Sequence, residues 1–335
     1  MSTVPIDHRA NKLTGLLRGQ SNDGSDILVL FVVVQIGCII AALLFPESFR
    51  YLSASNISVM LKAIPLLGVI ALGIGILMTA GEYDLSVGAT YTLAGIFMAK
   101  LVAENQVSAF VAAPLALILG VLIGLLNGFI TLRFNIPSFI ATLGTMLFWQ
   151  GMTLLYHGAQ SMRFTPAPAF TSLMAGAVGP FEAAFLWFLT LTLVAWALLH
   201  HHRLGNHVFA VGGNKEAATA IGIRPNLTKM IAFGIAGFCA AFSGILAAAR
   251  VGAIQPGQGA GLELRAIAAC VIGGVALSGG RGSVLGMLLG AALIYTIQDI
   301  LLLVRAPGFY LDIFVGILIV GAAILNEIVR QRRMR

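Results

Sequence analysis

Charged residues are scarce in this sequence: Asp, Glu, Lys and Arg make up 10% of the 335 residues, whereas soluble domains carry about a quarter. Apolar residues account for 59%, and the mean hydropathy is +0.95. Apolar runs of about 20 residues recur along nearly the whole chain, and each is long enough to cross a hydrocarbon core about 30 Å thick. The composition therefore excludes a soluble protein and leaves no room for a separate catalytic or nucleotide-binding domain.

Residue clusters typical of redox, metal or ATP chemistry are also lacking. The three cysteines, Cys38, Cys239 and Cys270, lie inside apolar runs without paired spacing, so we interpret them as packing residues. The glycines around Arg281 lack the Lys-Ser/Thr ending of a Walker phosphate loop, which predicts no ATP hydrolysis by this chain. We interpret the histidines at 200–202 as interfacial, because no cysteine or carboxylate cluster accompanies them.

The apolar runs predict an all-α polytopic membrane protein with about ten transmembrane helices. Nine or eleven remain possible, because short or re-entrant segments blur hydropathy. The predicted spans cover about 27–45, 59–80, 85–103, 109–132, 136–156, 181–199, 230–249, 264–277, 283–304 and 309–328. Pro65 and several glycines in the second run predict an interrupted or kinked helix, and we expect a loop at 157–180.

The distribution of Lys and Arg predicts the orientation, because basic residues near the ends of spans favour the cytoplasmic side. With a cytoplasmic N-terminus, thirteen of the twenty basic residues are cytoplasmic: Arg9, Lys12, Arg18, Arg133, Arg203, Lys215, Arg224, Lys229, Arg281, Arg330, Arg332, Arg333 and Arg335. We therefore expect a cytoplasmic segment 1–26, one transmembrane domain 27–328 with a cytoplasmic loop 200–229, and a basic cytoplasmic tail 329–335.

Glycine recurs at every fourth residue in two predicted spans. Gly120, Gly124 and Gly128 lie in the fourth span, and a second set, Gly282, Gly286 and Gly290, lies at the start of the ninth. This spacing places the glycines on one helix face and favours close helix packing. The fourth and ninth helices run in opposite directions, so the pattern is consistent with an inverted repeat of helices 2–5 and 7–10.

An acidic pair, Glu82 and Asp84, follows the second span. Asp84 precedes the third span and suits a helix N-cap, where a carboxylate accepts backbone N–H bonds. A proton or cation site is the alternative, since acids at membrane depth often mark function. The other candidates for such a relay, Asp299 and Asp312, have no visible partner in the sequence, which favours the cap.

The longest polar stretch after the N-terminus, residues 200–229, contains a short helix-prone segment. Asn214 suits its N-cap, Lys215 and Glu216 its first turn, and Gly222 its end. About two turns of helix are unstable alone in water, so we expect this helix to dock against a surface. That surface is either another part of this chain or a groove on a cytoplasmic partner.

This segment resembles the conserved cytoplasmic loop of bacterial ABC importer permeases of the ribose/xylose/arabinose/galactoside class. Its sequence is Gly-Asn-Lys-Glu-Ala-Ala-Thr-Ala-Ile-Gly-Ile. Three further blocks, at 84–88, 136–144 and 266–283, are similar to that family in the same order, and the resemblance runs from about residue 60 to 325. The chain departs from the pattern at Glu82-Tyr83, where relatives usually have Gly-Ile.

The resemblance implies a permease in the bacterial inner membrane that imports a monosaccharide or small polyol. It implies a dimer with itself or a sister permease, cytoplasmic ATPase subunits that hold ATP and Mg, a periplasmic sugar-binding protein, and no cofactor on this chain. The coupling helix would comprise Asn214, Lys215, Glu216, Ala217, Ala218 and Gly222. An ion-coupled secondary transporter and a membrane-embedded lipid enzyme are the alternatives.

Uncharged polar groups suit a pathway for sugars, which offer many hydroxyls. The candidates are Asp84, Ser86, Asn127, Asn135, Ser138, Thr142, Trp149 and Gln150. For each one, an ordinary interhelical hydrogen bond is the alternative. Candidates for docking the binding protein are Arg163, Gln255, Glu263 and Arg265, although a local ion pair would explain the last two equally well.

Overall fold

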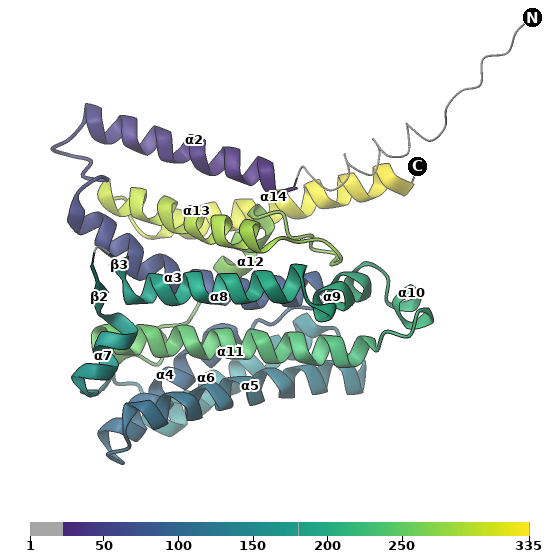
Figure 1. The fold of residues 1–335 in the computed structure, drawn as a ribbon, viewed down its shortest axis with the longest axis horizontal. Coiled ribbons are helices and arrows are strands. Elements are labelled where there is room, and N and C mark those ends of the chain that lie inside the picture. Colours follow the sequence, from purple (N-terminus) through teal and green to yellow (C-terminus); the bar gives the residue numbers. More distant parts are fainter. Residues whose placement is uncertain (1–22, 180, 335) are drawn as a thin grey trace, which may run out of the picture.

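The computed structural model describes residues 23–179 and 181–334. The predicted N-terminal segment up to residue 22 lies outside this part, as do the side chains of the basic tail. The described chain is almost entirely helical (Figure 1). Its long apolar helices are α2 (Asp23–Leu44), α3 (Ala54–Thr79), α4 (Val87–Ala103), α5 (Ala109–Phe134), α6 (Ser138–His157), α8 (Ala183–His200), α11 (Pro225–Val251), α13 (Val284–Leu303) and α14 (Phe309–Met334).

Each of the ten predicted apolar runs corresponds to one helix. Nine of these are the helices named above, and the eighth run corresponds to the short α12 (Leu262–Ile272). Within the described part of the chain, seven helices are long and apolar enough to cross a membrane, and α4, α12 and the apolar part of α14 are shorter. The predicted all-α polytopic architecture is confirmed. The count of about ten is approximate, because α12, with 11 residues, is too short to cross a bilayer by itself.

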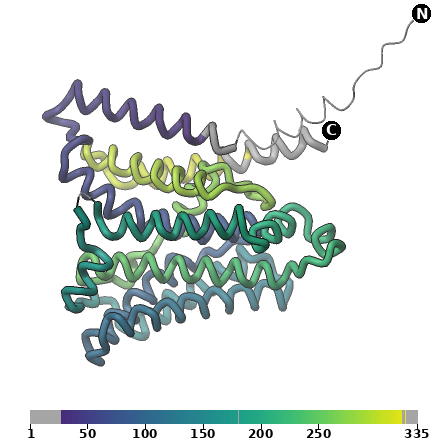
Figure 2. Tube along the Cα trace, viewed as in Figure 1, coloured from purple at the N-terminus to yellow at the C-terminus, as the bar shows by residue number. Residues whose placement is uncertain are grey.

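Short elements lie at the two ends of the helix bundle (Figures 1 and 2). One end carries α9 (Arg203–Gly213) and α10 (Lys215–Ala220), and we call it the α10 end. The opposite end, the far end, carries α7 (Pro168–Ala175) and two small sheets. Strand β1 (Met162–Arg163) pairs antiparallel with β4 (Ala253–Ile254), and β2 (Ala177–Val178) pairs with β3 (Phe181–Glu182). The predicted loop 157–180 is therefore partly ordered into helix and strand.

Irregular backbone inside the bundle precedes α12 and does not occur at Pro65 of α3. Helix α3 is continuous through Pro65, so no interruption occurs there. Instead, the chain after β4 runs back into the bundle beside α4, and α12 begins only at Leu262. The Gly259 N–H donates to Thr92 Oγ1 (3.0 Å), and a Cβ on Gly88 would come within 2.3 Å of Gly259 O. Irregular backbone is tolerated here because it is buried in protein.

The helix contacts within 54–157 and 225–334 correspond, which is consistent with a repeat of the predicted helices 2–5 and 7–10. Helix α4 contacts α5 and α6, and the corresponding α12 contacts α13 and α14. Helix α5 packs on α11, and its counterpart α13 packs on α3. The glycine stripes, however, face partners that the repeat does not relate: Gly124 meets Phe233 of α11, whereas Gly290 meets Ala269 of α12. The recurrence of glycine at every fourth residue therefore indicates close packing and is no evidence for the repeat.

Candidate functional site

Helix α10 is defined at both ends by hydrogen bonds that its sequence predicts. The Ala217 N–H donates to Asn214 Oδ1 (2.9 Å), which confirms the N-cap. After the last turn, the Ile223 N–H donates to Ala218 O and the Gly222 N–H to Thr219 O, both at 3.0 Å. This bond pattern is a Schellman motif, and Gly222 adopts the left-handed φ of +86° that such a motif favours.

The surface of α10 faces outward at the tip of the α10 end. Only Ala218 is buried, at 1% exposure, and α10 contacts α9 and α11. Lys215, Glu216 and Ala217 are exposed, and Ile221, just after the helix, is 75% exposed. Sequence reasoning missed Ile221, although its place before the terminating glycine indicates that it lies at the tip.

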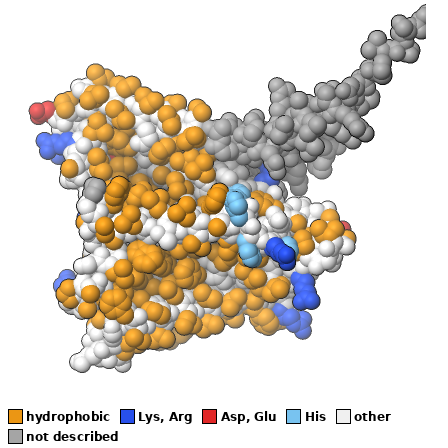
Figure 3. Space-filling model, in the orientation of Figure 1, with side chains coloured by type: hydrophobic (Ala, Val, Ile, Leu, Met, Phe, Trp, Pro, Cys, Tyr) orange, Lys and Arg blue, Asp and Glu red, His pale blue; other side chains and the backbone are white. Residues whose placement is uncertain are grey.

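Basic side chains and histidines gather around α9 and α10 (Figure 3). Arg133, Arg203, Lys215 and Arg224 are all exposed at this end. The histidine tract has a structural use, because His202 Nδ1 accepts the Leu204 N–H (3.1 Å) and caps α9. Within the described ranges, no group of three or more His, Cys, Asp or Glu could hold a metal ion.

At Gly212, near the end of α9, the backbone lies directly against the backbone of the bundle. A Cβ on Gly212 would lie 1.9 Å from Thr79 O and 2.6 Å from Gly280 N. The Gly280 N–H itself donates to Thr79 O (2.8 Å). The last turn of α3, the last turn of α9 and the turn that contains Gly280 thus meet in one junction at Gly212, three residues before α10 begins.

The two residues that depart from the family pattern connect the loop at 80–86 to its neighbours. Glu82 Oε1 pairs with Lys229 Nζ of α11 at 2.5 Å. The Tyr83 hydroxyl donates to Leu277 O. Burial, helped by the nearby Glu82 carboxylate, raises the pKa of Tyr83 to about 12, so the phenol keeps its proton and remains a donor.

Five of the predicted pathway residues form one buried polar cluster. Asp84 Oδ1 accepts the backbone N–H (2.8 Å) and the hydroxyl (2.7 Å) of Ser86. Asn127 Nδ2 of α5 donates to Asp84 Oδ2 (3.1 Å) and to Ser86 Oγ (2.7 Å). Ser138 and Thr142 of α6 accept the backbone N–H groups of residues 83 and 85, each at 3.0 Å. The cluster fastens the loop at 80–86 to α5 and α6.

The predicted N-cap role of Asp84 is wrong by two residues. The N-cap of α4 is Ser86, whose side chain makes no capping bond. Asp84 lies before the helix and binds Ser86 from outside it. Because Asp84 is only 1% exposed, its hydrogen bonds to Ser86 and Asn127 satisfy the buried carboxyl group.

The other three predicted pathway residues lie apart from this cluster. Asn135 is exposed and ends α5 in the left-handed conformation, with φ of +57°. Trp149 and Gln150 are partly buried on α6. The indole Nε1 of Trp149 is buried and has no hydrogen-bond partner among the described residues. The structure thus brings together the five predicted residues that support the loop at 80–86, and the other three lie elsewhere.

Of the four predicted docking residues, two are exposed without an ion pair in the described part of the chain, and two are buried or paired within this chain. Arg163 is exposed on β1, beside a cavity of about 570 Å³ that Val251 also lines, and Gln255 is exposed nearby. Glu263 is buried, at 8% exposure, and accepts the Gly261 N–H (3.1 Å), so its charge does not face a partner. Arg265 pairs with Asp312 (3.2 Å), which gives both residues a partner that the sequence did not indicate.

Comparison with known proteins places this fold in a family. A family model described as branched-chain amino acid transport system / permease component matches residues 56–323. The autoinducer 2 import system permease protein LsrC of Salmonella typhimurium is 32% identical over 309 residues, which cover 89% of this chain and 86% of that protein. No solved structure matches the chain.

Two further relatives carry the same name. The LsrC protein of Enterobacter sp. strain 638 is 35% identical over 287 residues, covering 85% of this chain and 82% of the relative. The LsrC protein of Escherichia coli strain K12 is 31% identical over 289 residues, covering 85% and 84%. Because the family model covers most of the chain, this protein belongs to the family of transport-system permease components and is a transport subunit without an ATPase site of its own.

Proposed function

We propose that this chain is the permease subunit of an ATP-driven, binding-protein-dependent importer of a monosaccharide or small polyol, and that α10 couples it to the ATPase. The observation that carries the proposal is α10 itself. It is a two-turn helix, capped at both ends, that projects from the bundle with only Ala218 buried. Its small, exposed outer face suits a groove on a partner subunit.

The partners follow from the two ends of the bundle. The ATPase subunits, with their ATP and Mg, would bind the α10 end, where the exposed basic residues gather. The excess of positive charge supports a cytoplasmic location of this end, and α14 also ends there (Figure 1). The periplasmic binding protein would then dock at the far end, near Arg163 and Gln255. A second permease, identical or a sister chain, would complete the complex in the inner membrane.

The buried cluster around Asp84 argues for a structural use of the predicted pathway residues. Asp84, Ser86 and the Asn127 amide nitrogen bond to one another, and each of the three residues is at most 1% exposed, whereas Asn127 Oδ1 is buried and has no hydrogen-bond partner among the described residues. In this proposal they hold the loop at 80–86, and the transport pathway is completed only by the second permease. Selection of the substrate would rest mainly with the binding protein.

The experiment is uptake into proteoliposomes that contain this chain alone, or this chain with its ATPase and binding protein, with and without internal ATP. Radiolabelled pentoses, hexoses and polyols are compared with leucine, isoleucine and valine, because the family description names branched-chain amino acids. Transport of a sugar or polyol by the complete, ATP-supplied system supports the proposal. Gradient-driven uptake by the chain alone, or transport only of the amino acids, contradicts it.

The role of α10 is tested separately by Ala217→Trp, since Ala217 is exposed on the outer face of the helix. We expect normal membrane insertion and loss of substrate-stimulated ATPase activity, because the indole keeps α10 out of the groove. Ala218 is unsuitable for this test, since it is buried against this chain. The matched control is Ala197→Trp, at an exposed position on α8 near the same end. Equal stimulation in both variants would remove α10 from the coupling role.

A further inference from the structure

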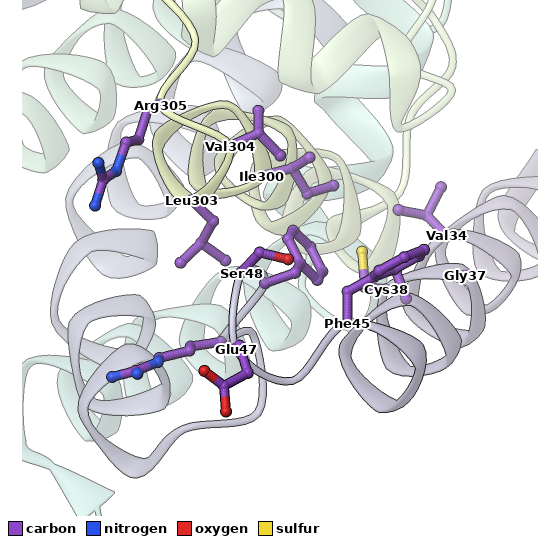
Figure 4. A pocket seen from close by; sticks show the side chains of 13 residues that line it. Val34, Gly37, Cys38, Phe45, Glu47, Ser48, Ile300, Leu303, Val304 and Arg305 are labelled. Carbon is purple, nitrogen blue, oxygen red and sulfur yellow. The ribbon is translucent and has the colours of Figure 1, made fainter.

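A cavity of about 1090 Å³ opens between α2 and the end of α13 at the far end of the bundle (Figure 4). One wall is α2, with Val34, Gly37 and Cys38, and the other is α13, with Ile300 and Leu303. Charged residues border the opening, and the walls between the helices are apolar. The cavity thus combines an apolar slot with a charged rim.

Two hydrogen bonds hold α2 beside α13 next to the cavity, and a glycine on α2 leaves space in its wall. Gln35 Nε2 donates to Thr296 Oγ1 (3.2 Å), and the Tyr51 hydroxyl donates to Gln35 Oε1 (2.6 Å), which fixes α2 beside α13. Next to this anchor, a Cβ on Gly37 would have no atom within 4 Å. The glycine therefore leaves space in the wall of the cavity.

The rim carries uncompensated positive charge. Arg50, Arg305 and Glu47 line the opening, and all three are exposed. Three other basic residues pair with a carboxylate: Lys62 with Glu182 (3.1 Å), Lys100 with Glu104 (3.7 Å) and Arg265 with Asp312 (3.2 Å). Among the described residues, no ion pair includes Arg50 or Arg305. Two cations and one anion leave a net charge of +1 at the rim.

We infer that this cavity binds one anionic glycerophospholipid, with its phosphate held by Arg50 and Arg305 and an acyl chain between α2 and α13. Guanidinium groups bind phosphate through charge-assisted hydrogen bonds, for which the planar fork of arginine is well suited. The single negative charge of phosphatidylglycerol matches the net charge of the rim. The slot lies between two apolar helices, and burial of an acyl chain in it adds to the affinity.

The lipid site does not depend on the proposed transport function, and its test uses the purified full-length chain. Native mass spectrometry measures the binding of phosphatidylglycerol and of phosphatidylcholine with the same acyl chains. We expect the wild-type protein to prefer phosphatidylglycerol by about tenfold. Arg50→Gln/Arg305→Gln should abolish this preference, because charge-assisted hydrogen bonds to the phosphate are lost. The matched control, Arg250→Gln, removes an exposed arginine at the far end of α11, outside the cavity, and should leave the preference unchanged.

A second variant tests the apolar slot. Gly37→Leu projects a side chain into open space in the cavity and favours the helix, so the protein should fold normally. We expect it to reduce binding of both lipids. Equal binding of the two lipids by the wild-type protein, or an unchanged preference in the double arginine variant, would overturn the inference. A preference for phosphatidylethanolamine over phosphatidylglycerol would also overturn it, since that lipid carries no net negative charge.

Discussion

Glu82 and Lys229 form an ion pair, 2.5 Å from Oε1 to Nζ, that joins the loop after α3 to the second turn of α11. Both side chains are largely buried, at 13% and 11% exposure. Helix α11 follows directly after α10, and the loop at 80–86 carries the buried Asp84. The pair therefore connects the helix that follows α10 with the loop at 80–86.

The first prediction concerns this ion pair. Glu82→Gln leaves the Lys229 ammonium buried without a counter-ion, and we expect a loss of about 3 kcal/mol in the free energy of unfolding. Thermal unfolding of the purified protein should therefore occur at a lower temperature. In the reconstituted transporter, we also expect weaker stimulation of the ATPase by substrate.

A charge exchange supplies the control for this prediction. Glu82→Lys/Lys229→Glu restores opposite charges across the same gap and should recover most of the lost stability. The coupling energy follows from a double-mutant cycle with the single variants. Additive effects of the single variants would show that the two side chains do not interact in the folded protein.

The second prediction uses two adjacent glycines at the end of α9. Gly212→Ala places a methyl group 1.9 Å from Thr79 O, so the junction of α3, α9 and the turn at Gly280 must open. Overpacking of this kind costs about 1–3 kcal/mol. Gly213→Ala is the matched control, because the nearest atom to its Cβ would be 3.9 Å away. We expect the control to be neutral or slightly stabilising, since alanine favours a helix.

Both glycine variants are compared with the wild type in thermal unfolding and in substrate-stimulated ATPase activity. The Gly212 variant should lose stability and coupling together, because the same backbone contact holds the segment that leads into α10. If both variants unfolded at the same temperature as the wild type, the close backbone contact at Gly212 would not exist in the protein.

The transmembrane helices were predictable because hydropathy summed over about 20 residues is a strong signal. The helix at 215–220 was predictable for another reason: Asn214 and Gly222 are local signals that depend on no distant contact. The start of α12 lies within two residues of the predicted one, but its end at Ile272 comes earlier than predicted, and the contacts of the irregular segment before it with Gly88 and Thr92 of α4, far away in the sequence, were not predictable.

The site residues show the same limit. Composition identified Asp84, Ser86 and Asn127 as polar groups in apolar surroundings, but it could not show that they bond to one another. The burial of Glu263 and the pairing of Arg265 with Asp312 also arise from tertiary contacts. For this reason the contacts of these residues could not be predicted from the sequence.

The third prediction tests the buried cluster by exchanging its donor and acceptor. Asn127 Nδ2 and Asp84 Oδ2 are 3.1 Å apart, so Asn127→Asp places two carboxyl groups within hydrogen-bond distance of each other. Because two carboxylates at this distance repel each other, the variant should be strongly destabilised. Asp84→Asn/Asn127→Asp returns an amide donor and a carboxylate acceptor to this pair. We expect the double variant to be more stable in thermal unfolding than Asn127→Asp alone. Asn135→Asp, an exposed change at the end of α5, is the matched control and should have little effect.

The fourth prediction concerns docking at the far end and rests on the proposed function. Arg163 is exposed, and no ion pair among the described residues includes it, so its charge is available to a binding protein. We expect Arg163→Glu to slow association several-fold at low salt, with a smaller effect at high salt, because salt screens exposed charges.

The matched comparison for Arg163 is Arg265→Glu at the same end. Arg265 is already paired with Asp312, so its reversal should lower stability more than it changes association. Surface plasmon resonance with the binding protein as analyte measures the association rate, and thermal unfolding measures stability. An association rate that is unchanged by Arg163→Glu at every salt concentration would exclude Arg163 from the docking surface and direct attention to the exposed Gln255 beside it.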